Sequence, residues 1–335
     1  MHIAKQKNNK NTSNSKALHS RNLHKHGYDF AALTKAYPLL SPYVNANIHG
    51  NQSIDFGNPS AVKALNAALL KQYYHIDKWD IPTGALCPPI PGRVDYIHYI
   101  AELLRISNDE NAANGSTVTP VSTTKPAIKL LDIGTGANGI YPLLACQIYG
   151  WHCVGSDINA QSLDNVTAII ANNPNLKGNF SIRKQSDNNL IFKGVIKADE
   201  FYDVTVCNPP FHASQQEAIK GSQRKVNNLA RNRAEKSLTS KTSTTTNISS
   251  KPTLNFGGQA AELWCNGGER LFLKKMIKES QIFSTQCRWF TSLVSKSENV
   301  KPAIKLIKKL GATDVKEIQM EQGNKITRII AWTYL

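Results

Sequence analysis

Two hydrophobic spacings alternate along the second half of the chain. Compact apolar runs such as IKLLDI and YDVTVC have the length of buried strands. Segments with apolar residues at helical spacing lie between such runs, among them GIYPLLACQIYG and QSLDNVTAIIANN. Strands that alternate with helices are typical of a parallel sheet with crossover helices. The pattern predicts a doubly wound, Rossmann-like, mostly parallel α/β domain over residues 127–335.

The C-terminal part continues this alternation. It contains a helical segment ERLFLKKMIKESQIF, an apolar run RWFTSLVS and a second helical segment VKPAIKLIKKLG. Two more apparent strands follow, ATDVKEIQM and TRIIAWTYL. We expect this terminal pair to close one edge of the sheet as an antiparallel hairpin.

Helical spacing also marks residues 28–106, ahead of the sheet. The segments AALTKAYPLLSPYV and PSAVKALNAALLKQYY repeat apolar residues every three or four positions, and Asn58 with Pro59 is a typical helix start. A proline-rich stretch then leads into a segment that becomes amphipathic from Val94 onward, which places Arg93 at a helix start. We therefore predict a helical N-terminal extension that caps the domain.

Three polar segments interrupt these patterns. Residues 1–27 contain lysines and arginine, no acidic residue and almost no apolar periodicity, which indicates a disordered basic arm. Residues 107–126 consist of small and polar residues and are predicted to form a loop. The Ser- and Thr-rich run at 236–252 is too polar to pack, so we expect a second disordered loop there.

The charge of the chain points to a polyanionic partner. Its 335 residues include 40 Lys and Arg against 24 Asp and Glu, a formal net charge of +16. The six cysteines include no CxxC pair, so we expect neither a zinc site nor a disulfide framework. No run approaches about 18 apolar residues, and we expect a cytoplasmic protein without metal or membrane.

A glycine-rich turn follows the first strand of the domain. Asp132 precedes Gly134 and Gly136 in DIGTGANG, and glycines there allow a tight turn and close approach of a ligand. The same letters contain the G-x-G-x-x-G of dinucleotide sites, with Asp157 about 20 residues further on, so a nicotinamide enzyme is one interpretation. The acidic residue directly before the turn instead resembles the cofactor loop of class I methyltransferases.

A second motif, Asn208-Pro209-Pro210-Phe211, follows the strand YDVTVC and so lies at a carboxyl end of the sheet, where such folds bind ligands. The Asn208 amide oxygen and the Pro209 carbonyl can accept the hydrogens of a planar amine, which turns its lone pair toward a methyl donor. Pro210 stiffens the turn, and Phe211 offers a stacking face for a base. The alternative is a proline turn that only ends the strand.

Together these motifs resemble the ribosomal RNA large subunit methyltransferase F family. The resemblance runs from about Arg21 to the C-terminus and includes PGRVDYIHYIAELL, SIDFGNPSAVKALNAALL and LNFGGQAAELWCNGGE. It implies a class I methyltransferase fold with a seven-stranded sheet and S-adenosyl-L-methionine as cofactor. It also implies N6 methylation of adenine 1618 in 23S rRNA. The sequence leaves open whether the substrate is naked rRNA, a large-subunit assembly intermediate or the mature subunit. We expect a monomer.

The resemblance also assigns roles to residues. It implies that Arg93 faces the methionine carboxylate and that the turn with Gly134, Thr135, Gly136 and Asn138 wraps the methionine part. It further implies that Asp157 holds the ribose of the cofactor and that Asp187 lies near the adenine ring of the cofactor. For the stretch from Glu262 to Glu269, with its Gly267-Gly268 pair, the sequence indicates only a loop at the border of the substrate site.

Two other functions stay open at this point. A glutamine-amide methyltransferase of a translation factor has a closely similar Asn-Pro-Pro-aromatic geometry, and the basic arm argues against it. A catalytically silent RNA-binding platform is the second, and the intact glycine turn and Asn208 argue against that. His98 and His212 are more typical of structural side chains than of bases.

Overall fold

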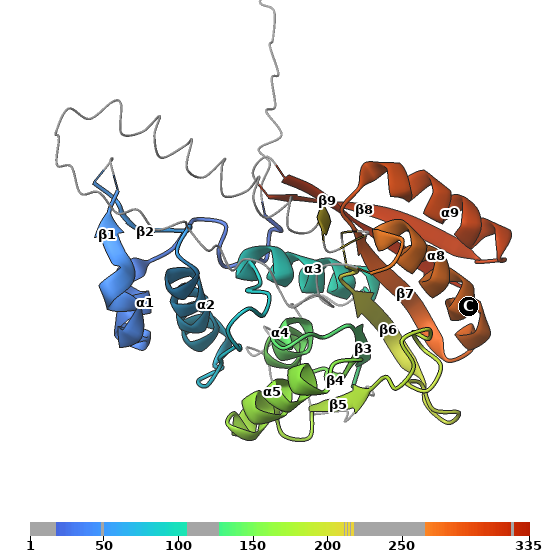
Figure 1. Ribbon diagram of the computed structural model, residues 1–335, viewed down its shortest axis with the longest axis horizontal. Helices are drawn as coiled ribbons and strands as arrows, with labels where there is room; N and C mark the ends of the chain where they lie inside the picture. Colours follow the sequence, from blue (N-terminus) through green and yellow to red (C-terminus); the bar gives the residue numbers. More distant parts are fainter. Residues whose placement is uncertain are drawn as a thin grey trace, which may run out of the picture.

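The computed structural model describes residues 18–47, 50–105, 127–210, 265–322 and 325–335, together with residues 212, 214, 216 and 217. Its centre is a seven-stranded sheet with the order β5-β4-β3-β6-β7-β9-β8 (Figure 1). Strands β5, β4, β3, β6 and β7 are parallel to one another. The β8–β9 hairpin completes the sheet, and its strand β9 pairs antiparallel with β7. The strands are β3 Lys129–Ile133, β4 His152–Asp157, β5 Phe180–Lys184, β6 Tyr202–Cys207, β7 Cys287–Val294, β8 Asp314–Gln322 and β9 Lys325–Thr333. The predicted doubly wound, Rossmann-like fold and its terminal hairpin are confirmed.

Helices cover both faces of the sheet because strand side chains alternate between them. Along β3, Leu130 belongs to one cluster of buried residues with α4, whereas Leu131 belongs to a second cluster with α8 and α9. Each face thus has its own apolar core. The helices of the domain are α4 Ile140–Tyr149, α5 Ala160–Ala171, α8 Gly268–Ser280 and α9 Val300–Lys309, with short 3-10 turns at Pro174–Leu176, Gln281–Phe283 and Ser297–Asn299.

The first part of the predicted extension, residues 28–74, lies at the end of the molecule opposite α8 and α9, whereas its last helix, α3 Ile90–Leu103, lies in the middle, beside α4 (Figure 1). Asn58 caps α2, as its position before Pro59 predicted, and its side chain accepts hydrogen bonds from the N–H groups of Ser60 and Ala61 at 3.0 and 3.4 Å. The elements of the extension before α3 are α1 Phe30–Ala36, a 3-10 turn at Pro38–Tyr43, the hairpin β1 Val44–Ala46 and β2 Gln52–Ile54, and α2 Pro59–Tyr74.

Helix α3, Ile90–Leu103, begins earlier than the amphipathic pattern from Val94 predicted. Pro91 is tolerated there because the first N–H groups of a helix have no partner within it. Arg93 consequently lies in the first turn of α3 rather than before it. The next turn carries Tyr96, which is fully buried.

The expected disorder of residues 18–27 is wrong, because the structure packs this segment against the extension. Asn22 is fully buried, and its amide nitrogen donates to the Pro91 carbonyl at 2.9 Å and to the Asp95 carboxylate at 2.5 Å. His24 is also buried and its Nε2 lies 2.8 Å from the Tyr74 hydroxyl. Hydrogen bonds and ring contacts of buried polar residues hold the segment, so its composition resembled that of an unstructured arm.

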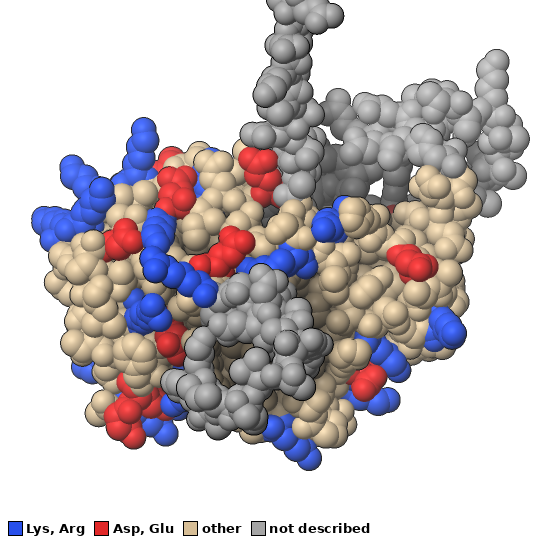
Figure 2. Space-filling view, turned by 180° about the vertical axis from the view of Figure 1, so that it is seen from behind, with Lys and Arg blue, Asp and Glu red and all other residues tan. Residues whose placement is uncertain are grey.

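The remaining predicted segments lie outside the described residues, namely positions 1–17, the loop at 107–126 and the run at 236–252. Among the helices that the structure describes, none is long and apolar enough to cross a membrane. Helix α9 carries exposed lysines at positions Lys301, Lys305, Lys308 and Lys309. Lys and Arg side chains gather at the edge of the molecule that contains α9 (Figure 2).

Candidate active site

A cavity of about 440 Å³ opens at the carboxyl ends of β3, β4 and β6, within the size range of small-molecule sites. Open α/β sheets bind their ligands at this edge, so the location agrees with the sequence prediction. Most of the predicted site residues share the wall of the cavity. These are Arg93, Gly134, Thr135, Gly136, Asn138, Asp157, Asn208 and Pro210.

The other predicted residues lie elsewhere. Asp132 and Pro209 are buried immediately beside the wall. Asp187 is not among the residues of the wall, and its carboxylate accepts the N–H of Asn189 at 2.7 Å within a turn. Gln185 lines the cavity two positions earlier. Phe211 lies outside the described residues.

The glycine turn is fastened to the end of the neighbouring strand. Gly134 and Thr135 both donate their N–H groups to the Ser156 carbonyl at 2.9 Å. Gly134 and Gly136 have φ values of +73° and +61°, a conformation that favours glycine. The turn therefore presents backbone rather than side chains to the cavity.

Asp157 links this turn to the start of α5. One carboxylate oxygen accepts the Gly136 N–H at 2.9 Å, and the other accepts the Asn159 N–H at the same distance. Burial raises the pKa of Asp157, and these N–H groups act in the opposite direction. Each oxygen keeps a second lone pair, so the side chain can also accept from paired hydroxyl groups.

Arg93 reaches the cavity from α3. Its Nη1 donates to the Tyr141 hydroxyl at 2.5 Å, and the guanidinium carbon lies 5.4 Å from the centroid of the Tyr141 ring. Its Nε is buried without a hydrogen-bond partner among the described residues. Tyr141 also lines the cavity, and nothing in its helical sequence context had indicated this.

Asn208 stands at the end of β6, where buried hydroxyl groups fix the strand. The Cys207 N–H donates to the Tyr96 hydroxyl at 3.4 Å, and that hydroxyl lies 2.7 Å from the hydroxyl of Thr291 on β7. The Oδ1 atom of Asn208 is buried and has no hydrogen-bond partner in the described part of the chain. An unsatisfied acceptor of this kind is suited to a donor group on a ligand.

Two further side chains of α3 have structural roles. Tyr96 is fully buried and hydrogen-bonded, so it packs in the interior. His98 is also buried, its Nδ1 lies 2.8 Å from the Tyr149 hydroxyl, and it does not line the cavity. Burial lowers the pKa of His98 to about 3, so the ring is neutral and structural.

Asp132 is the most strongly perturbed carboxyl group of the site. Burial raises the pKa of Asp132 to about 7, while the neighbouring Thr135 hydroxyl and Arg93 guanidinium act in the opposite direction. Both of its carboxylate oxygens are buried without a hydrogen-bond partner within the described residues. The charge of Asp132 therefore changes with pH near neutrality.

A pH dependence of stability follows from this shift. Below about pH 4 Asp132 is protonated in both states, and between about pH 4 and 7 only the unfolded chain has lost the proton. Stability is therefore lost as pH rises through this interval. We expect the free energy of unfolding of Asp132→Asn, relative to the unsubstituted protein, to increase by up to about 1.4 kcal/mol per pH unit there and to level off above it. Denaturant titrations from pH 4.5 to 8.5 measure this, and a difference independent of pH would contradict it.

Comparison with known proteins identifies the family. A family model described as RNA methyltransferase matches residues 12–335. A protein of Saccharophagus degradans named ribosomal RNA large subunit methyltransferase F is 59% identical over 330 residues, which is 98% of this chain and 99% of that protein. The chain belongs to this RNA methyltransferase family. A protein of the same name from Shewanella baltica is 55% identical over 95% of this chain and 81% of its own length.

Solved structures agree with this membership. The catalytic domain of hMettl16 in complex with the MAT2A 3'UTR hairpin 1 has a TM-score of 0.73 at 26% identity, over 95% of this chain and 96% of that one. The N-terminal domain of human METTL16 in complex with SAH has a TM-score of 0.68 at 24% identity, over 95% and 99%, a likeness of fold alone. The resemblance stated from the motifs is thus confirmed, and the glycine turn belongs to a methyltransferase.

Proposed function

We propose that this protein transfers the methyl group of S-adenosyl-L-methionine to the N6 amine of an adenine in 23S rRNA. The observation that carries the proposal is the buried Oδ1 atom of Asn208, which lacks a partner among the described residues beside the cavity. An amide oxygen in this place can accept a hydrogen of an exocyclic amine and so direct its lone pair into the cavity.

The residues of the cavity fit the chemistry of this cofactor. Arg93 is a cation with a buried, unpartnered Nε, which suits the methionine carboxylate. The turn from Gly134 to Asn138 can wrap the methionine part, and Asp157 has lone pairs for the ribose hydroxyls. Gln185 and Asn188 belong to the cavity wall and Asp187 does not, so we assign contacts with the adenine ring of the cofactor to Gln185 and Asn188. When bound, S-adenosyl-L-methionine supplies an electrophilic methyl group on a positively charged sulfur.

The contribution of the protein to the reaction is placement. The N6 amine of adenine is a weak nucleophile and a very weak acid, so removal of its proton before transfer is unfavourable. Asn208 and the Pro209 carbonyl instead hold the amine by its two hydrogens, and Pro210 stiffens this turn. The sequence adds Phe211 as a stacking face. Such preorganised acceptors act mostly in the transition state.

The target is a flipped or single-stranded adenine, because the amine of a stacked and paired base cannot enter a cavity. The names of the relatives favour large-subunit RNA as substrate, and the resemblance implies adenine 1618. The solved complex of hMettl16 contains an RNA hairpin. The excess of Lys and Arg, including the exposed lysines of α9, provides contacts for phosphates.

Calorimetry and labelled methyl transfer test this function. We expect S-adenosylhomocysteine to bind and NADH not to bind. The wall contains Arg93, which suits the carboxylate of S-adenosylhomocysteine, and Asp157, which suits its ribose. With labelled cofactor, we expect the label on adenine N6 of 23S rRNA and not on a glutamine of a translation factor. Label on the protein substrate, or binding of NADH alone, would overturn the proposal. Cofactor binding without transfer to any adenine of 23S rRNA or a large-subunit assembly intermediate would leave an RNA-binding platform as the better description.

A further inference from the structure

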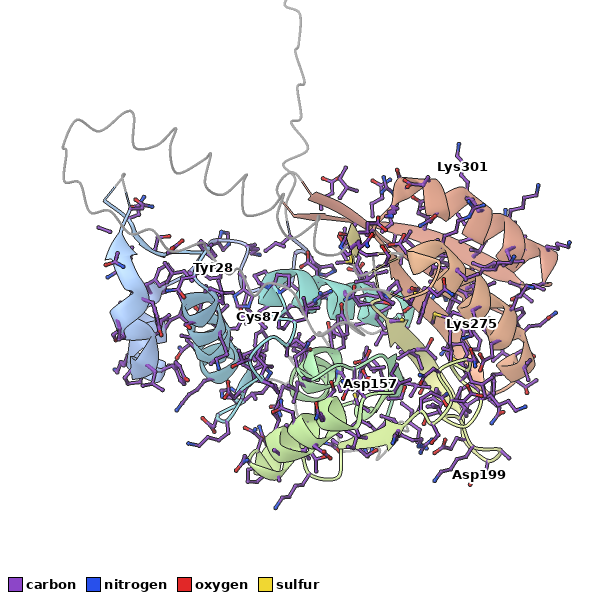
Figure 3. All side chains as sticks on the ribbon, viewed as in Figure 1. Tyr28, Cys87, Asp157, Asp199, Lys275 and Lys301 are labelled. Carbon is purple, nitrogen blue, oxygen red and sulfur yellow. The ribbon has the colours of Figure 1, made fainter. Side chains whose placement is uncertain are left out.

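Helix α8 forms one wall of the cavity through Leu271, Phe272 and Lys275. Lys275 on this helix and Asp157 at the end of β4, both labelled in Figure 3, line the same cavity, and the Lys275 Nζ donates to the Asn188 carbonyl at 3.2 Å. The helix also carries one buried glutamate near each end, Glu269 and Glu279, at 1% and 8% exposure. Buried carboxylates require several hydrogen bonds, and both glutamates have them.

Glu279 holds the segment that follows β5. Its carboxylate accepts the N–H groups of three consecutive residues, from Ile191 at 2.9 Å, Phe192 at 2.8 Å and Lys193 at 2.7 Å. Leu190 and Ile191 belong to the cavity wall on the side of Gln185. The carboxylate therefore fixes the wall at the end of the cavity that suits the nucleoside.

Glu269 holds the loop that follows β7. Its carboxylate accepts the Ser295 N–H at 2.8 Å, the Ser295 hydroxyl, the Lys296 N–H at 3.1 Å and the Asn299 amide at 2.8 Å. Ser295 lines a small second cavity of about 60 Å³ together with Arg93 and Asn208. The Glu269 carboxylate therefore fixes the surroundings of Asn208, whose amide is suited to the amine that accepts the methyl group.

Further contacts join the same end of α8 to the chain beyond Asn208. The Lys296 Nζ donates to the Glu217 carboxylate at 3.4 Å, and the Cys265 N–H donates to the His212 carbonyl at 3.1 Å. Gly267 has a φ of +76°, and a Cβ there would lie 2.6 Å from the Leu271 side chain, so only glycine allows the helix to begin at this point. The start of α8 thus explains the Gly267-Gly268-Glu269 stretch, for which the sequence had indicated only a loop.

We propose that Glu279 and Glu269 are positioning residues with separable roles. Glu279 sets the wall for the nucleoside part of the cofactor, and Glu269 sets the loop beside the acceptor amine. The two lie ten residues, or about 15 Å, apart on one helix, so each acts on its own end of the site. This inference rests on the proposed function, because it assigns the cavity to the cofactor.

The experiment compares Glu279→Gln with Glu269→Gln in the full chain. Glutamine keeps the shape but turns an N–H₂ group toward backbone N–H groups, so each variant loses part of its network. For Glu279→Gln we expect the Kd of S-adenosylhomocysteine to rise by about tenfold, with kcat at saturating cofactor near that of the unsubstituted protein. For Glu269→Gln we expect kcat on RNA to fall by about tenfold with an unchanged Kd of S-adenosylhomocysteine.

Glu298→Gln is the matched control, because Glu298 is exposed in the same loop and loses the same charge. Parallel losses of affinity and kcat in both glutamine variants, or no loss in either, would overturn the inference. If the glutamine variants do not fold, Glu279→Asp and Glu269→Asp keep the charge and provide the same comparison. Failure of the proposed function is distinct, since the unsubstituted protein would then neither bind S-adenosylhomocysteine nor methylate RNA.

Discussion

Replacement of Asn208 by alanine is expected to lower kcat for RNA methylation by about 10²- to 10³-fold, comparable to the loss of one preorganised hydrogen-bonding group at a reacting centre. The Oδ1 atom of this residue is buried, lacks a partner among the described residues and lies beside the cavity. Its removal leaves the acceptor amine without orientation, mainly in the transition state. Cofactor affinity should change little. Single-turnover assays on an adenine-containing rRNA fragment, with calorimetry for S-adenosylhomocysteine, measure both quantities.

Asn208→Asp should be milder, because it keeps an acceptor oxygen in the same place. Asn172→Ala is the control, since that asparagine is exposed on the surface next to α5. Near-normal turnover by Asn208→Ala, in a protein whose melting curve is unchanged, would mean that the Asn-Pro-Pro segment is only a turn that ends β6. The amine would then have to be held elsewhere.

Replacement of Trp332 by alanine is expected to lower the free energy of unfolding by about 3 to 5 kcal/mol. Trp332 on β9 is fully buried, and its ring stacks on Phe290 of β7 with centroids 5.8 Å apart. Its indole N–H donates to the Ser280 hydroxyl at the end of α8 at 2.9 Å. The substitution thus removes a large apolar side chain and a buried hydrogen bond at once. Urea titration of the apoprotein measures the change.

Trp332→Phe separates the two contributions. It keeps most of the ring and loses the hydrogen bond, so we expect a loss of about 1 to 3 kcal/mol, smaller than that of the alanine variant. A loss below about 1 kcal/mol for Trp332→Ala, with an unchanged dependence on urea concentration, would show that this packing of β9 against β7 and α8 contributes little to stability.

Local patterns determined the order of the elements. The apolar runs gave the strands of the sheet, and Asn58 before Pro59 gave the start of α2, because burial periodicity and capping involve only neighbouring residues. The glycine turn and Asn208 were also recognised in this way, and both line one cavity. They follow strands of one parallel sheet, so the fold class already places them at the same edge.

Local patterns failed where polar groups carry the contacts. Residues 18–27 have no apolar periodicity, and Asn22 nevertheless docks on α3 through hydrogen bonds to residues some 70 positions away. The start of α3 was placed too late for a related reason. Its first turn is rich in proline, and the hydrophobic pattern alone does not separate a proline-rich loop from a helix that begins with proline.

The fold class, the methyltransferase family and the two motifs in the cavity wall could be recognised without coordinates, since each depends on residues adjacent along the chain. Only the tertiary structure placed Tyr141 against Arg93, kept Asp187 out of the wall, and joined Glu269 and Glu279 to loops on opposite sides of the cavity. The contacts of Tyr141, Glu269 and Glu279 join segments that are far apart in the sequence. A contact of that kind leaves no periodic trace in a sequence, because its two partners are brought together only when the sheet and helices have packed.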